Sequence, residues 1–304
     1  MSSTRLGSIP SDSNHPNNNA YPLSSFQPIP IATPAKPRKK RRGCFTLLFM
    51  LLLLSVFYPL RVNLAVLGVD RAPKGTAAGR TDTIILVTAP PFIPRLRLLS
   101  IPRDLWVAIP GVGENRINTA HFFAEAAQPG TGPKAALAAI EQNFGIRMPY
   151  YVRFQFQGFV DILTALGGVT IRLDEPMSGY EAGKHHLDPT QALAFVRDRK
   201  GSDDFARMRR GQMMVRAVAG KLLNPLNWWR IPVVAGAALR ALDTNIPIWL
   251  YPRLGVSLIV SAVGGLDGQT LTREMVTPYT TSEGANVLLP VWERILPVVQ
   301  KMFR

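Results

Sequence analysis

An uncharged apolar run, Cys44–Leu60, limits what this chain can fold into more than any other feature. A basic cluster, residues 38–42, stands directly before it. A helix needs about 17 apolar residues or more to cross a bilayer, and this run reaches that lower limit. A buried helix of a soluble domain normally keeps some polar character on one face, which this run lacks. The sequence therefore predicts one transmembrane helix at residues 44–60.

A secretory signal peptide also combines basic and apolar regions, but it begins near the N-terminus. Here the polar residues 1–37 come first, and Phe57–Leu60 is a poor cleavage site. Because those first residues are rich in Ser, Asn and Pro, we expect disorder there. Basic residues beside a membrane helix stay in the cytoplasm. We therefore expect a single-pass cell-membrane protein with a cytoplasmic tail (residues 1–43) and an extracytoplasmic domain (residues 61–304).

The composition agrees with a globular outer domain. Hydrophobic residues make up 47% of the chain, and residues 61–304 are long enough for one large core, although length alone also permits two domains. With Cys44 as the only cysteine, no intrachain disulfide or cysteine metal site can form. The net charge is +15, which indicates an anionic partner such as acidic lipid, phosphate or nucleic acid, or else a solvated basic surface.

Strand-like and helix-like stretches alternate along the outer part. Apolar strands are predicted at residues 62–70, 84–87, 96–101, 150–156 and 169–173. Helices are predicted at residues 134–143, 159–166, 189–197, 205–223 and 291–303, with short strands among the last sixty residues. This alternation is typical of an α/β or α+β domain in which helices cover a sheet.

Acidic and arginine side chains gather at the ends of these strands and in a second cluster. The first group comprises Asp70, Arg80, Asp82, Arg103 and Asp104, and the second comprises Arg197, Arg199, Arg207, Arg209 and Arg210. Arginine forks match phosphate oxygens, and carboxylates with phosphates are the usual surroundings of Mg²⁺. These residue types therefore suit a pyrophosphate–metal site, although surface ion pairs could use the same residues. Signatures of serine hydrolases, zinc proteases, P-loop enzymes, kinases and dinucleotide-binding proteins are absent.

Together these motifs resemble the LytR–CpsA–Psr family of cell-envelope glycopolymer transferases. The resemblance rests on stretches in family order over about residues 62–223: LAVLGVD (64–70), RTDT (80–83), LSIPRDLWVAIPG (99–111), RINTA (116–120), FQGFVDILTALGGV (156–169), GKHHL (183–187), QALAFVRDR (191–199) and DDFARMRRGQ (203–212). The family's usual upstream anchor also fits the predicted layout.

The resemblance implies an α/β/α sandwich around a mixed central sheet. It also implies a phosphotransferase that moves an anionic glycopolymer from a polyprenyl-pyrophosphate carrier onto peptidoglycan. The family's metal-binding acids fall on Asp70 and Asp82, which would hold Mg²⁺. Its site residues fall on Arg80, Asp82, Arg103, Arg197, Arg199 and Arg207. The residues expected to line its apolar lipid tunnel are Phe154, Phe156, Phe159, Val160 and Leu163, although residues of these types are more often ordinary core.

One departure stands out: many family members carry Arg-Gln-Gln where this chain has Arg210-Gly211-Gln212. Either Gln212 replaces the missing contact or the contact is dispensable. The residues leave the acceptor open, since water would make the chain a pyrophosphate hydrolase. They also leave open whether Asp82 or Asp104 takes the proton. A non-catalytic carrier-binding or regulatory envelope protein is the third reading. Nucleic acid is not expected as a partner, because the basic domain is predicted outside the membrane and carries no nucleic-acid-binding motif.

Overall fold

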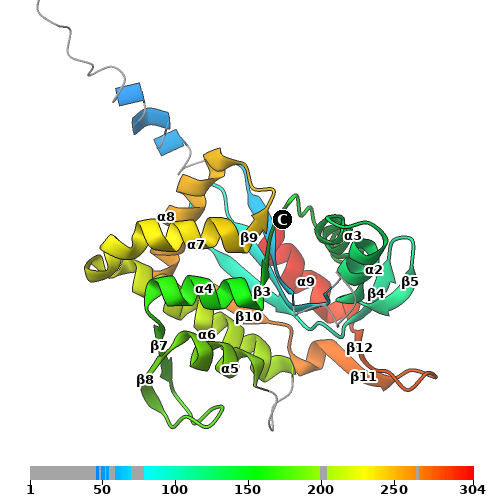
Figure 1. Ribbon diagram of the computed structural model, residues 1–304. Helices are drawn as coiled ribbons and strands as arrows, with labels where there is room; N and C mark the ends of the chain where they lie inside the picture. The colour runs from blue at the N-terminus through cyan, green and yellow to red at the C-terminus, as the bar shows by residue number, and fades with distance from the viewer. Residues whose placement is uncertain are drawn as a thin grey trace, which may run out of the picture. The chain divides into compact units, whose positions relative to one another are not determined.

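A mixed six-stranded sheet forms the centre of this computed structural model (Figure 1). The structure describes residues 46–47, 49–51, 53–54, 59–69, 79–198, 204–264 and 267–304. The strands lie in the order β10 (Asp267–Thr270), β3 (Arg97–Ile101), β2 (Thr81–Ala89), β1 (Val62–Val69), β6 (Tyr150–Gln155) and β9 (Leu242–Thr244). β2 is antiparallel to β1 and β3, whereas β6 runs parallel to β1 and β10 parallel to β3.

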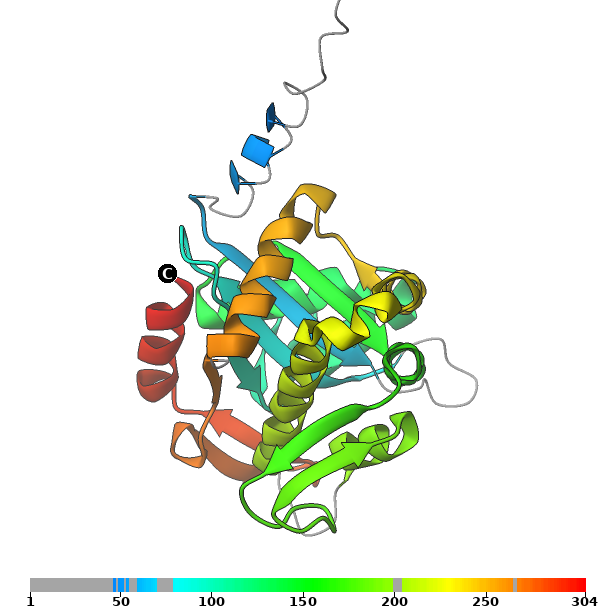
Figure 2. The same ribbon diagram turned by 90° about the vertical axis from the view of Figure 1, so that its left-hand side faces the viewer.

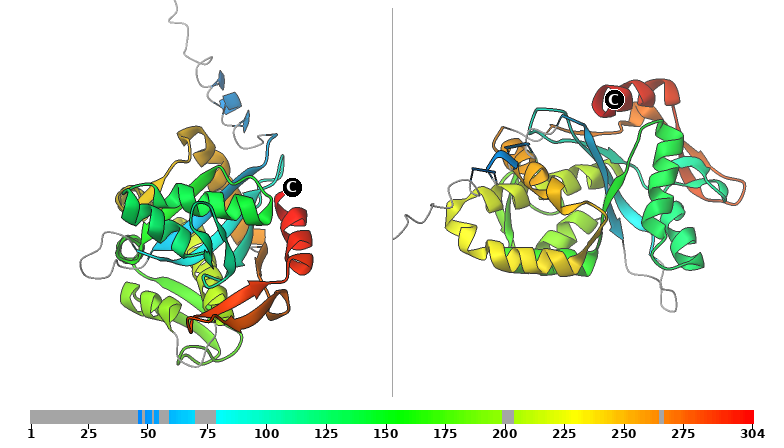
Figure 3. Two further views of the ribbon diagram at one scale, coloured as in Figure 1. Left: turned by 90° about the vertical axis from the view of Figure 1, so that its right-hand side faces the viewer. Right: turned by 90° about the horizontal axis from the view of Figure 1, so that it is seen from above.

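Helices cover both faces of this sheet. The helices are α2 (Thr119–Ala127), α3 (Gly132–Phe144), α4 (Phe156–Leu166), α5 (Pro189–Arg197), α6 (Asp204–Leu223), α7 (Ile231–Ala241), α8 (Tyr251–Gly264) and α9 (Trp292–Phe303). Seen from above, α7 and α8, in yellow and orange, lie on one side of the strands, and α3 and α9, in green and red, on the other (Figure 3).

The alternation of side chains along β1 builds a core on each face. Ala65 and Leu67 belong to a buried cluster with residues of α3 and α9. Val62 and Leu64 point to the opposite face and join a cluster that includes Leu250, which directly precedes α8. Because both faces of the central strands are covered, they read as continuous apolar runs.

Smaller elements complete the fold. Two-stranded ribbons are formed by β4 (Trp106–Ile109) with β5 (Gly113–Arg116), β7 (Val169–Leu173) with β8 (Gly183–Leu187), and β11 (Val276–Thr280) with β12 (Asn286–Pro290). Three short 3-10 helices are described as well: η2 (Pro225–Arg230), η3 (Ile248–Leu250) and η4 (Arg273–Met275).

The predicted elements and the observed ones differ mainly at four places. The strand predicted through Phe156 ends at Gln155, and α4 starts at Phe156. The helices α2, α7 and α8 were not predicted. α7 and α8 are rich in apolar residues all round, so their periodicity does not separate helix from buried strand.

Within the described residues, no helix has both the length and the apolar character needed to cross a membrane. The predicted tail, residues 1–43, lies outside the described residues, and so do eight of the seventeen residues of the predicted membrane helix, residues 44–60. Residues 43–304 form one compact unit by their internal contacts.

Candidate active site

A β-bulge at the start of β2 places Asp82 at the end of the sheet. Val69 pairs with Thr81 and Gly68 pairs with Thr83, so Asp82 is the extra residue on β2 without a partner on β1. Bulges of this kind redirect a side chain and are common beside active sites. Val69 is the last residue of β1, so the bulge lies at the carboxyl ends of β1 and β6, where Val69 is paired with Gln155.

Arg103 connects two carboxylates beside this bulge. It follows β3, and its Nη1 donates a hydrogen bond to Asp82 Oδ1 at 2.8 Å. Its Nε donates to Asp104 Oδ2 at 3.3 Å. All three side chains are largely buried, with exposed fractions between 14% and 21%. Charge-assisted bonds between partly buried groups fix this arginine firmly in place.

Asp104 is held from several sides. Its other carboxylate oxygen forms an ion pair with Arg116 Nε at 3.5 Å, and its backbone carbonyl accepts from the Leu288 amide on β12. Arg116 also donates from Nη2 to the carbonyl of Asn286. Asp104 therefore fastens the β3–β4 connection to the β11–β12 ribbon, whereas Asp82 faces the site.

A narrow recess of about 20 Å³, lined by charged and apolar side chains, opens onto an apolar cavity. Asp82, Arg103 and Arg207 all line the recess. Four residues, Thr83, Ile85, Val196 and Gly211, line both the recess and the neighbouring cavity of about 250 Å³. The cavity lies between the sheet and helices α4, α6 and α8, and nearly all of its wall is apolar. Two arginines and an acid at one end of an apolar cavity suit an amphiphile with a phosphate head and a hydrocarbon tail.

Comparison with known proteins identifies the family of this chain. The profile of the LytR_cpsA_psr family matches residues 59–283, about three quarters of the chain. The chain belongs to the LytR–CpsA–Psr family.

Among relatives, the regulatory protein MsrR of Staphylococcus aureus is 28% identical over 73% of this chain and 66% of its own length. The polyisoprenyl-teichoic acid–peptidoglycan teichoic acid transferase TagU of Oceanobacillus iheyensis is 35% identical over 61% of this chain and 58% of its own. The chain thus spans less than two thirds of either relative. The crystal structure of TagV from B. subtilis has the same fold, with a TM-score of 0.65 and 23% identity over 81% of this chain and 98% of TagV.

The aromatic residues predicted for a lipid tunnel all reach the apolar cavity. Phe154, Phe156 and Phe159 line it, whereas Val160 and Leu163 are not among its lining residues. Leu163 is fully buried in a separate cluster of α4, α5 and the β7–β8 ribbon. Gly68 makes room for Phe154, since a Cβ there would lie 3.0 Å from the Cβ of Thr83 and 3.1 Å from the Phe154 ring.

The remaining predicted site residues take different positions. Arg197 is not among the lining residues of the cavity or the recess, but its guanidinium lies 5.0 Å from the centre of the ring of Phe156, which lines the cavity. Arg80 is exposed and stacks on Phe122 of α2 at 5.5 Å, outside the recess lining. Asp70 and Arg199 lie outside the described residues. Within the described part, no group of three His, Cys, Asp or Glu side chains is arranged for a metal ion.

The glycine that departs from the family pattern lies at the junction of recess and cavity. A Cβ at Gly211 would meet no atom within 4 Å, so the space beside this turn of α6 is open. Gln212 does not fill it, because its side-chain amide donates to Ser100 Oγ at 3.1 Å and to the Gln269 carbonyl at 2.7 Å. Gln212 therefore ties α6 to β3 and β10.

Arg153, which sequence reasoning missed, organises a second charged cluster at the end of β6. It forms ion pairs with Asp243 at 2.7 Å and with Glu125 at 3.1 Å. His121 accepts from Arg153 at Nε2 (3.4 Å) and donates from Nδ1 to the Gly79 carbonyl at 3.1 Å. Arg153 is the only charged residue in the strand predicted at residues 150–156, and this was the signal that could have revealed it.

Burial and hydrogen bonding shift the titration of this cluster. Burial lowers the pKa of His121, and the hydrogen bond to Gly79 only partly opposes this effect. Burial alone would raise the pKa of Glu125, but the backbone amides of Gly130 and Gly132 and the charge of Arg153 lower it overall. His121 is therefore neutral and Glu125 ionised at neutral pH, and His121 holds the chain just before Arg80 through the Gly79 carbonyl.

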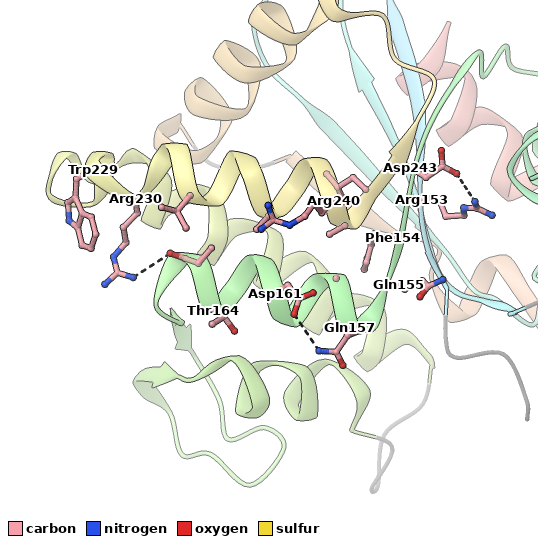
Figure 4. A pocket seen from close by; sticks show the side chains of 16 residues that line it. Arg153, Phe154, Gln155, Gln157, Asp161, Thr164, Trp229, Arg230, Arg240 and Asp243 are labelled. Carbon is pink, nitrogen blue, oxygen red and sulfur yellow. Dashed lines mark hydrogen bonds and ion pairs between the residues drawn. The ribbon is translucent and has the colours of Figure 1, made fainter. Parts of the chain in front are cut away.

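A large open groove of about 900 Å³ runs between α4 and α7 (Figure 4). One end carries Trp229 and Arg230, and the other carries the Arg153–Asp243 pair. Phe154 and Leu242 line both this groove and the apolar cavity, so they form the wall between the two. Further polar side chains along the groove are Gln155, Gln157, Asp161, Thr164 and Arg240.

Proposed function

We propose that this chain is a phosphotransferase that moves an anionic glycopolymer from a polyprenyl-pyrophosphate carrier to peptidoglycan. The observation that carries this proposal is the recess of Asp82, Arg103 and Arg207 opening onto an apolar cavity. The printed name of the relative TagU, a polyisoprenyl-teichoic acid–peptidoglycan teichoic acid transferase, supports it. We further propose that residues 44–60 anchor the chain in the cell membrane, with residues 61–304 on the outer side.

In this mechanism the lipid tail occupies the cavity and the pyrophosphate occupies the recess. An acceptor hydroxyl of peptidoglycan attacks the phosphorus atom that carries the glycan. The bond from that phosphorus to the bridging oxygen breaks, polyprenyl phosphate leaves, and a phosphodiester joins glycan to acceptor. Arg103 and Arg207 stabilise the negative charge that develops on the phosphate oxygens.

Asp82 is the group that we propose takes the hydroxyl proton. It lines the recess, where it accepts a hydrogen bond from Arg103. Asp104 is engaged by Arg103 and Arg116 and does not line the recess. Of the two carboxylates, Asp82 is therefore the one placed to meet an incoming hydroxyl.

Mg²⁺ is the cofactor we propose, held by Asp82 and Asp70. Mg²⁺ usually binds through one or two carboxylates with substrate phosphates and water, so the single described carboxylate in the recess suits it. Bound there, Mg²⁺ would neutralise charge on the pyrophosphate oxygens. Arg103 and Arg207 orient the same oxygens from the protein side.

We also propose that the groove between α4 and α7 binds the sugars of the glycan or the acceptor. Its exposed Trp229 offers a flat apolar face for a sugar ring, and its carboxylates, amides and guanidinium groups can bond to hydroxyls. The lining is slightly basic, which suits an anionic polymer, because it contains three arginines and two aspartates: Arg153, Arg230, Arg240, Asp161 and Asp243.

The test is reconstituted transfer with the full chain in lipid, a lipid-pyrophosphate-linked glycan and isolated peptidoglycan. We expect Arg103→Ala, Asp82→Ala and Arg207→Ala each to abolish most of the transfer. Arg209→Ala is the matched control, because Arg209 lies on the same helix but is 64% exposed and pairs with Glu175 outside the site. Wild-type transfer by all three site variants would overturn the proposal. Release of free glycan phosphate without peptidoglycan attachment would establish hydrolysis instead.

A further inference from the structure

The hairpin between β2 and β3 ends in a strained and exposed apolar tip. The tip reads Pro90-Pro91-Phe92-Ile93-Pro94, and Phe92 and Ile93 are 62% and 58% exposed. Phe92 adopts a left-handed backbone conformation, with φ of 59°. A bulky residue in this region costs roughly 1–3 kcal/mol and persists only where its surroundings enforce it. Here the flanking prolines and α8 hold two large apolar side chains out into the solvent.

Helix α8 is fastened along this hairpin. Near its start, the buried Arg253 donates from Nη2 to the Pro90 carbonyl at 2.6 Å. Near its end, Ser261 Oγ accepts from the Leu96 amide at 2.7 Å. Ala89, which directly precedes Pro90, pairs with Val62, the first residue of β1. Both contacts between α8 and the hairpin therefore lie at the end of the sheet where β1 begins. Figure 2 shows α8, in orange, crossing in front of the strands on that side.

The outer surface of this region is apolar. The six side chains Leu60, Phe92, Ile93, Ile248, Trp249 and Val263 are between 46% and 79% exposed, and we call them the docking face. Single exposed apolar residues are ordinary, but these six belong to segments that border one another through the strand pairing of β1 with β2 and the hydrogen bonds between α8 and the hairpin, which is the arrangement of an interaction surface.

Charge around the docking face has one predominant sign. Residues 244–264 contain no Asp or Glu, and neither do residues 89–97. Arg61, Arg95 and Arg97 lie around the hairpin; Asp267, paired with Arg97 at 3.4 Å, offsets only part of this charge. A basic rim around aromatic and aliphatic side chains is the pattern of proteins that rest on anionic membranes. Two copies meeting through this face would bring the same basic rims together, which disfavours a second copy as the occupant.

The inner side of α8 connects the docking face to the apolar cavity. Leu258 on α8 lines that cavity, and Leu250 and Leu254 pack against the start of β1. A single helix, α8, therefore separates the exposed apolar surface from the cavity that we assign to a lipid tail. Leu60, within the docking face, is also the last residue of the predicted membrane segment.

We propose that the docking face sits in the headgroup region of a bilayer that contains anionic lipid, with Phe92 and Ile93 as a wedge. This contact is additional to the membrane helix predicted at residues 44–60. The inference rests on the proposed function in one respect only, which is the identity of the lipid that enters the cavity. It fixes the domain against the membrane so that the cavity wall formed by α8 faces the lipid phase.

The experiment measures the depth of spin labels in the full chain, reconstituted in vesicles of phosphatidylglycerol and phosphatidylethanolamine. Labels are attached at Ile93→Cys and Val263→Cys in a Cys44→Ser background. Val112→Cys is the matched control, because Val112 is an equally apolar residue, 46% exposed, on the turn between β4 and β5. We expect the first two labels to be accessible to oxygen and shielded from a water-soluble nickel complex, and the control to show the reverse.

Three outcomes would overturn the proposal. The labels at 93 and 263 could have the same water accessibility as the control. They could instead show dipolar broadening that disappears on dilution with unlabelled chain, which would make a second copy the occupant. Shielding that is unchanged in phosphatidylcholine vesicles would remove the role of the basic rim. Label depth does not depend on turnover, so absence of transfer activity would count against the proposed function alone.

Discussion

Arg103 Nη1 lies 2.8 Å from Asp82 Oδ1 while its Nε reaches Asp104, so one guanidinium fixes two carboxylates at the mouth of an apolar cavity. A lysine at this position would keep the positive charge but lose the planar guanidinium group that bonds to both carboxylates at once. We expect Arg103→Lys to lower kcat/KM for transfer by about two orders of magnitude, the usual effect of losing one well-placed charge-stabilising donor. Steady-state transfer assays check this, with Arg209→Lys as control. Activity within threefold of wild type would show that charge alone suffices.

Gly211 offers a second test, because it stands where the recess meets the cavity and has open space beside it. Gly211→Ala should leave transfer unchanged and raise the free energy of unfolding by about 0.5–1 kcal/mol, since glycine is costly within a helix. Gly211→Leu should project into the junction and raise KM for the lipid-linked donor. Equal KM values for the two variants would mean that the donor does not pass this point.

Trp229 and Trp228 are adjacent and both exposed, but only Trp229 lines the groove between α4 and α7. We expect Trp229→Ala to weaken binding of soluble peptidoglycan fragments or glycopolymer, measured by calorimetry without lipid donor. Loss of one stacked ring should weaken binding by roughly tenfold, which corresponds to ~1.4 kcal/mol. Trp228→Ala should bind as wild type does. Identical losses in both variants would point to a general effect on η2.

The pH dependence of stability should report on His121. Its folded pKa lies below the usual value of 6.5, because burial disfavours the charged ring. The unfolded chain therefore binds the proton first as pH falls, so the contribution of His121 to stability is complete above about pH 6.5 and is lost below it. Urea unfolding at about pH 7.5 and about pH 5.5 should show a larger loss for wild type than for His121→Gln. Parallel losses would assign the pH dependence to other groups.

The sequence predicted the central strands and the helices with clear caps well, for physical reasons. α5 is observed at residues 189–197 as expected, because Asp188 and Gln191 form a capping box ahead of it and Pro189 occupies its first turn. α4 ends at Leu166 as expected, because Gly167 adopts the left-handed conformation that ends helices. α7 and α8 also have a proline in the first turn, Pro232 and Pro252, but α7 has no side-chain cap, and the apolar faces of both helices gave no clear period.

The candidate site was only partly predictable from sequence. The family motifs identified Asp82, Arg103 and Arg207 as site residues, and the structure places all three in one recess. The bulge that presents Asp82 depends on the register between β1 and β2, which no local pattern specifies. Arg116 was within a quoted motif, but its ion pair with Asp104 depends on a tertiary contact.

Filling the apolar cavity tests whether a lipid tail occupies it. Val152 points from β6 into the cavity and is among its lining residues. Val152→Trp should fill that space with little loss of stability, whereas the same change in a fully packed core costs roughly 1–3 kcal/mol or more. We expect mass spectrometry to detect polyprenyl phosphate retained by the wild-type chain and by Val152→Ile, and to find none on Val152→Trp. Thermal unfolding of each variant separates the two explanations of a negative result. A stable Val152→Trp variant that retained lipid would place the tail elsewhere, and a strongly destabilised one would mean that the side chains close the cavity in solution.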